Sequence, residues 1–75
     1  MFDVTTTSPL DDRWEETDKL LYAAAGRPSD TNEADIKSRT HVWRVPTFPA
    51  ATRLRKRLIR VRGVRAVIQE TVTRE

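Results

Sequence analysis

Cysteine is absent from this chain of 75 residues, which excludes disulfide bonds and metal sites built on thiolates. Apolar residues form no long run, since the longest such stretch, LLYAAAG (20–26), is far too short to span a bilayer. The N-terminal MFDVTTTSP lacks the basic-then-apolar pattern of a secretory signal. We therefore expect a soluble protein of the cytoplasm, built as one small domain over 1–75.

The charges are distributed unevenly along the chain, although the formal net charge is only +3. Residues 1–40 carry 5 basic and 9 acidic side chains, whereas residues 41–75 carry 9 basic and 2 acidic side chains. A separation of charge this strong can steer association with a charged partner.

The N-terminal third predicts a strand followed by a helix. FDVTTT (2–7) is rich in β-branched and aromatic residues, which predicts a short strand. Ser8 is placed to cap a helix over 9–25, with Pro9 at its first position, where a missing N–H costs nothing. Apolar residues at helical spacing line one face of that helix: Leu10, Trp14, Leu21, Ala24 and Ala25. Gly26 then ends the helix.

The middle of the chain predicts a polar loop and a short strand. Turn-forming residues fill 26–40, and within this loop 34–39 could form a weak edge strand anchored only by Ile36. HVWRV (41–45) is a better strand, and Pro46 ends it.

The C-terminal third predicts a second helix and a last strand. Thr47 can cap a helix over 48–62. Its apolar stripe follows helical spacing: Ala51, Leu54, Leu58 and Val61. Gly63 is placed as the left-handed residue that ends this helix. The strand 64–72 then directs Val64, Ala66 and Ile68 to one face.

This order of elements, β-α-(β)-β-α-β, is that of the split βαβ, ferredoxin-like arrangement. It predicts an α+β domain with both helices on one face of a small antiparallel sheet. An alternative treats 59–69 as a hairpin that turns at Arg62-Gly63. Arg-Gly is a poor two-residue turn compared with Asn-Gly, so we favour the helix followed by a strand.

The basic helix provides the main candidate for a binding site. Four cations project from the side away from the apolar stripe: Arg53, Lys56, Arg57 and Arg60. They could bind phosphates, dock on an acidic protein, or form a solvated face. Arg55 and Arg62 lie at the border of the stripe, where their stems can cover apolar surface. The sequence has no helix-turn-helix spacing, zinc finger or aromatic RNA-binding motif for direct base readout.

The first helix carries the opposite charge. Its alternative acidic contact face consists of Asp12, Glu15 and Glu16. Asp11 and Asp18, which flank the apolar stripe, could meet Arg55 or Arg62 of the basic helix. The acidic face could also contact a partner protein, or join a second copy through helix faces of opposite charge.

Single residues of the predicted strand 41–45 and the first helix are further candidates. We expect Trp14 and Trp43 to be core anchors, Trp43 because Arg44 occupies the other face of its strand. The alternative exposes Trp43 as a platform for stacking or protein contact. Arg44 and Tyr22, which falls off the apolar stripe, are candidate contact residues. His41 is the only histidine and is expected to be structural.

These observations predict a binding protein rather than an enzyme. No nucleophile motif, acid–base pair or cofactor motif is present, and the carboxylates of one helix face offer at most two metal ligands. We therefore expect no cofactor and no metal. Short, charged domains without cysteine often serve as accessory regulators or phage-encoded inhibitors of host systems, so we expect protein–protein binding. The alternative is a small nucleic-acid-binding domain that uses the Arg-rich helix 53–62.

Overall fold

The computed structural model describes residues 1–71 and shows a four-stranded sheet with two helices. In chain order the elements are β1 (Phe2–Pro9), α1 (Trp14–Ala25), β2 (Thr31–Ala34), β3 (Ser38–Val45), α2 (Phe48–Leu58) and β4 (Arg65–Glu70). Neither helix is long and apolar enough to cross a membrane. The predicted α+β class is confirmed.

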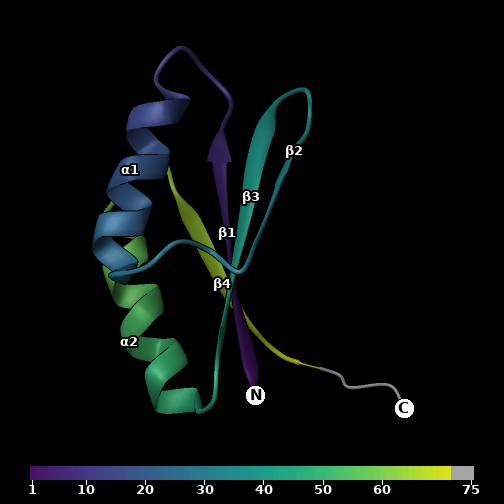
Figure 1. Cartoon of the computed structure of the whole chain (residues 1–75), viewed down its shortest axis with the longest axis vertical. Helices are drawn as coiled ribbons and strands as arrows, with labels where there is room; N and C mark the ends of the chain where they lie inside the picture. Colours follow the sequence, from purple (N-terminus) through teal and green to yellow (C-terminus); the bar gives the residue numbers. More distant parts are fainter. Residues whose placement is uncertain (72–75) are drawn as a thin grey trace.

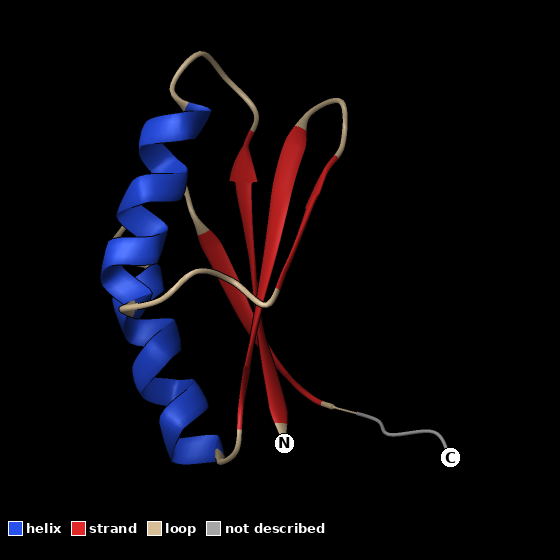
Figure 2. Ribbon diagram, in the orientation of Figure 1, coloured by secondary structure: helices blue, strands red, loops and turns tan. Residues whose placement is uncertain are grey.

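The strands form one antiparallel sheet in the order β2-β3-β1-β4. Both helices lie on the same face of this sheet, so that the molecule has a helical layer and a sheet layer (Figures 1 and 2). β1 pairs with β3 along its whole length, from Phe2 opposite Val45 to Pro9 opposite Ser38. β4 and β2 are therefore the two edges of the sheet.

The core lies between the helical layer and the sheet, because alternate residues of each strand point toward the helices. Its buried apolar side chains come from all elements except β2: Val4, Leu21, Trp43, Val45, Ala51, Leu58, Val64 and Ala66. Trp43 is completely buried, which confirms the prediction of a core anchor. Trp14 is only half-buried and lies outside this cluster, so the same prediction for Trp14 is wrong.

The predicted start of the first helix is wrong. β1 continues through Ser8 and Pro9, and Ser8 is almost completely buried instead of capping a helix. The helix begins at Trp14, and Asp11 accepts a hydrogen bond from the backbone N–H of Arg13 at 2.9 Å. The ladder with β3 outweighs the local capping signal, because it satisfies several backbone groups at once.

The predicted edge strand at 34–39 is also wrong. β2 ends at Ala34 and β3 already begins at Ser38, so most of the predicted strand forms the turn of a hairpin. The backbone N–H of Asp35 donates to the Ser38 carbonyl at 2.7 Å and closes this turn. Ile36, the proposed anchor, is 89% exposed.

α2 begins as predicted but ends earlier. The Thr47 hydroxyl caps it by accepting a hydrogen bond from the Ala50 N–H at 3.3 Å. The helix ends at Leu58, and a separate turn then leads to Gly63, whose φ of 80° is the predicted left-handed conformation. The hairpin alternative is wrong, because this turn joins a helix to β4. The predicted end of the last strand at residue 72 lies outside the described residues.

Replacing Thr47 with alanine should lower the free energy of unfolding by about 1 kcal/mol, because an N–H of α2 loses its acceptor. Thr52→Ala is the matched control, since Thr52 lies inside α2 and only returns a hydrogen bond to the Phe48 carbonyl. Urea unfolding followed by circular dichroism measures both. Equal losses for the two variants would contradict the capping role.

Candidate functional site

α2 and the turn after it display the predicted cations on the outer side of the helical layer. Arg53, Lys56, Arg57 and Arg60 are all exposed, and we call them the basic face. No ion pair joins any of them to a carboxylate among residues 1–71. Only three of the other arginines among these residues form such a pair.

Three arginines elsewhere in the fold each contact a carboxylate. Arg27 pairs with Asp30 at 3.1 Å, and Arg44 pairs with Asp3 at 3.2 Å. Arg39 contacts Asp18 at 2.8 Å. The basic face therefore differs from these arginines in having no counter-charge within the described chain.

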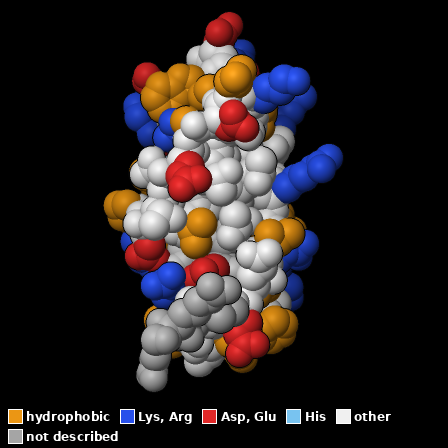
Figure 3. Space-filling model, turned by 90° about the vertical axis from the view of Figure 1, so that its right-hand side faces the viewer, with side chains coloured by type: hydrophobic (Ala, Val, Ile, Leu, Met, Phe, Trp, Pro, Cys, Tyr) orange, Lys and Arg blue, Asp and Glu red, His pale blue; other side chains and the backbone are white. Residues whose placement is uncertain are grey.

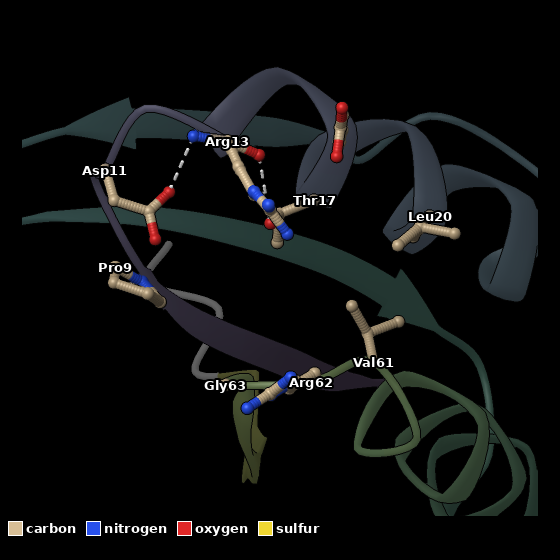
Figure 4. A pocket seen from close by; sticks show the side chains of 9 residues that line it. Pro9, Asp11, Arg13, Thr17, Leu20, Val61, Arg62 and Gly63 are labelled. Atoms are coloured by element: carbon tan, nitrogen blue, oxygen red, sulfur yellow. Dashed lines mark hydrogen bonds between the residues drawn. The ribbon is translucent and has the colours of Figure 1, made fainter.

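A groove runs beside the basic face, between α1 and the turn that follows α2. Two adjoining clefts of about 560 and 450 Å³ form it and share Leu20, Val61 and Arg62. Leu20 is 57% exposed and faces Val61 across the groove (Figure 4). We call this continuous cleft the interhelical groove.

The two ends of the interhelical groove carry different charges. Arg57 and Arg60 line the end nearest the basic face. Asp11, Arg13 and Glu16 line the other end, close to the start of α1. An apolar middle with a cationic end and a mixed, partly acidic end suits a protein surface better than a uniform polyanion.

The acidic face of Asp12, Glu15 and Glu16 is fully on the surface, as predicted from helical spacing. The expected pairing of Asp11 and Asp18 with Arg55 or Arg62 is wrong. Asp18 binds β3 instead, and Arg55 donates from Nε to the Ala66 carbonyl at 3.0 Å. The prediction failed because it assumed that side chains of the two helices pair with each other, whereas Asp18 turns toward β3 and Arg55 turns toward β4.

Asp18 and its neighbours form a polar network beneath α1. One carboxylate oxygen of Asp18 lies 2.9 Å from Nε2 of the completely buried His41, and the other lies 2.8 Å from Nη2 of Arg39. On the other side of its ring, Nδ1 of His41 lies 3.0 Å from the Ser29 hydroxyl. We call Asp18, Ser29, Arg39 and His41 the polar brace.

The polar brace contains a serine, a histidine and an aspartate, the residue types of a hydrolase triad. Substrate access is what distinguishes a catalytic triad from a structural network. His41 is 0% exposed. Neither it nor Ser29 or Asp18 lines the interhelical groove or the clefts beside α2. Its contacts join α1, β3 and the loop between α1 and β2, so we assign the polar brace a structural role.

Tyr22 is not the exposed contact residue expected from the sequence. Its ring packs edge-to-face on His41 and Trp43, with centroids 5.5 and 6.3 Å apart, and it is half-buried against the core. The helical pattern indicated an off-stripe position, but His41 and Trp43 of β3 pack against that side of α1. Trp14 is also half-buried, and the Arg39 guanidinium lies 4.6 Å from its ring centroid.

The face of the sheet opposite the helices holds Arg44 but provides no aromatic platform. Arg44 is exposed on this face, as its place in the strand predicted, and it contacts Asp3. Backbone and side chains that are neither apolar nor charged dominate the centre of this face (Figure 3), and threonines of paired strands meet there, such as Thr7 and Thr40. Because Trp43 points into the core, the predicted alternative of a stacking surface is wrong.

Sequence reasoning identified the basic face but missed Leu20 and the polar brace. Leu20 does not belong to the apolar stripe of α1, and its exposure could be judged only once α2 was placed. A signal for the polar brace did exist, since Arg39, His41 and Trp43 alternate along β3 and therefore share one face. Its carboxylate partner lies 23 residues from His41 in the sequence, which no local pattern reveals.

Replacing Asp18 with asparagine should lower the free energy of unfolding by about 1–3 kcal/mol, because Arg39 and His41 lose a charged partner in a largely buried setting. Asp12→Asn makes the same chemical change on the surface and should stay within about 0.5 kcal/mol of wild type. Chemical denaturation measures the difference. A loss at residue 18 no greater than at residue 12 would show that the polar brace is not structural.

The carboxyl group of Asp30 should titrate below the usual value of 3.8. Its pKa is lowered because it accepts a hydrogen bond from the Arg44 backbone N–H and another from the Arg27 side chain. A lowered pKa stabilises the fold fully above the unfolded-state value, and this contribution disappears as the pH falls through the folded-state value.

Carbon-detected NMR titration of the side-chain carboxyl groups tests this directly. Compared with wild type, Asp30→Asn should be less stable at neutral pH by under about 1 kcal/mol, since the pair is half-exposed, and this difference should vanish in acid. A carboxyl that titrates at or above the usual value would contradict the two hydrogen bonds.

Comparison with protein-family models, with curated protein sequences and with solved structures gave no match, so the function must be inferred from the chain's own surface.

Proposed function

We propose that this protein is a non-enzymatic binding protein of the cytoplasm that docks on an acidic surface of another protein and so regulates or inhibits it, as accessory regulators and phage-encoded inhibitors do. The docking surface consists of the basic face and the adjoining interhelical groove. The proposal is carried by one observation: the basic face has no counter-charge in the described chain, whereas Arg27, Arg39 and Arg44 each have one.

The charge of α2 has a physical cost that a partner would offset. The helix contains four basic and no acidic residues in Phe48–Leu58, so repulsion within it goes uncompensated. Carboxylates on a partner would supply the missing charge and would also accelerate the encounter. Exposed arginine, with its planar fork of donors, suits carboxylates particularly well.

The interhelical groove favours a protein over a nucleic acid as the ligand. Leu20 and Val61 offer an apolar surface directly beside Arg57 and Arg60, which a phosphate backbone would not use. At its far end, Asp11 and Glu16 offset the charges of Arg13 and Arg62, so this end gives a uniform polyanion no net attraction. A protein can place apolar, acidic and basic groups opposite all three parts of this surface.

Nucleic-acid binding remains the competing proposal, because the four cations of the basic face could each neutralise a phosphate. The two proposals differ in their need for Leu20. Phosphate binding requires only cations, whereas protein docking also uses the apolar middle of the groove.

Nuclease-treated lysate of the natural host should yield a partner for the tagged protein. The double substitution Arg57→Glu and Arg60→Glu should weaken that complex by about tenfold or more. The matched control, Lys19→Glu and Lys37→Glu, makes the same charge change at exposed sites outside the groove and should bind nearly as well as wild type. Leu20→Ser should also weaken the complex.

Affinity is then measured with the purified partner by fluorescence anisotropy, alongside an arbitrary DNA duplex and a single strand. Binding to nucleic acid that falls steeply with salt and ignores Leu20→Ser would favour the competing proposal. Equal loss in both double variants, or no partner after nuclease treatment, would contradict docking through this surface.

A further inference from the structure

β4 is an edge strand whose outer side pairs with no other strand among residues 1–71. The Thr71 N–H donates to the Met1 carbonyl at 2.9 Å, and β4 continues the same antiparallel register with β1 from Glu70 back to Arg65. Because strand residues alternate in direction, residues 65, 67 and 69 bond to β1, while Ala66, Ile68 and Glu70 point their N–H and C=O groups outward. The edge therefore presents a row of donors and acceptors.

This edge lacks the features that usually protect a strand from pairing. β4 contains no proline, lysine or bulge, its two charged residues, Arg65 and Glu70, stand only at its ends, and Val67 at its centre is 54% exposed. The opposite edge is different, because β2 has only four residues, all of them exposed and none a large apolar residue. Within the described chain, the side chain that occupies this edge is that of Arg55, whose Nε donates to the Ala66 carbonyl. A carbonyl oxygen can accept a second hydrogen bond.

α2 has an exposed flank next to this edge, distinct from its core stripe and from the basic face. Phe48, Thr52, Arg55 and Ile59 follow one another at intervals of four, three and four residues and so share one side of the helix. Phe48 is 56% and Ile59 43% exposed. A shallow cleft of about 480 Å³ separates Phe48, Thr52 and Arg55 of this flank from residues 66–68 of β4.

Along both the flank of α2 and the edge of β4, the pattern of polar and apolar residues is similar in either chain direction. Along β4, a polar residue stands on each side of Ala66-Val67-Ile68. Along the flank, the apolar Phe48 and Ile59 enclose the polar Thr52 and Arg55. The hydrogen bond from Arg55 to Ala66 and the shared cleft place the two centres side by side. A two-fold axis at these centres therefore sets the apolar positions of one copy opposite the apolar positions of the other.

We propose that the edge of β4 binds a second copy of this chain by antiparallel strand addition about an axis through Val67. In this register Ala66 and Ile68 of one copy face Ile68 and Ala66 of the other, and their outward N–H and C=O groups pair. The two four-stranded sheets become continuous. Phe48 of each copy packs against Ile59 of the other, so that exposed apolar surface is removed from water.

All the residues that pair in this register lie within 65–69, which the structure describes. The basic face lies on a different side of α2 and stays exposed. The interaction is therefore independent of the acidic partner and also differs from association between helix faces of opposite charge. Docking on an acidic partner and association of oppositely charged helix faces both weaken as salt is added, because they depend on charge. Strand pairing supported by apolar contacts keeps its strength in salt.

Sedimentation equilibrium of the purified protein tests the proposal. We expect a mass twice that of the 8.7 kDa chain at high concentration, and expect it to persist in molar salt. Val67→Lys, which places two like charges at the axis, should raise the dimer dissociation constant by about tenfold or more. Ile68→Pro should do the same, because it removes an outward N–H that β1 does not use.

Thr31→Lys is the matched control, since it adds the same charge at the exposed edge formed by β2 and should leave the dimer intact. Circular dichroism verifies that each variant is folded, and Val67→Lys alone suffices if the proline variant is not. A monomer at millimolar concentration would overturn the proposal. A dimer that dissociates in high salt, or whose dissociation constant is unchanged by Val67→Lys, would also overturn it. None of these three results would bear on docking through the basic face.

Discussion

The carboxylate of Asp18 joins α1 of the helical layer to β3 of the sheet. It extends from the middle of α1 to two side chains of β3, Arg39 and His41, while His41 in turn contacts Ser29 in the following loop. A chain of this length buries a modest apolar core, so polar contacts between layers carry more of the fold's specificity. With α1 fixed in this way, Leu21 is buried in the core and Tyr22 lies against Trp43.

The sequence predicted the α+β class because local signals and hydrophobic periodicity agreed for most of the elements. Thr47 capped α2 as expected, and Trp43 was buried because Arg44 required the other face of β3. The errors arose where two signals competed. Ser8 and Pro9 resemble a helix start, but pairing with β3 extends β1 through both residues. The strength of that pairing depends on a strand 30 residues away, which local pattern cannot show.

The candidate site was predictable to the extent that it belongs to a single helix. Helical spacing placed the basic face correctly, because α2 is regular and its apolar stripe is clear. The interhelical groove needs the relative position of two helices, so Leu20 gave no signal in the sequence. Asp18 was expected to contact a cation of α2, and it contacts Arg39 of β3 instead. In each case the missing information was which element packs against which.

The arrangement of the layers connects the two interaction surfaces. A two-fold axis through Val67 runs perpendicular to the sheet, since it relates two strands that lie in one continuous sheet. Such an axis keeps both helical layers on the same side, and the two basic faces then point in the same general direction. A partner with two acidic patches could bind both faces at once, and the second contact would be intramolecular. Dimer formation would thus strengthen docking without any new contact at the basic face.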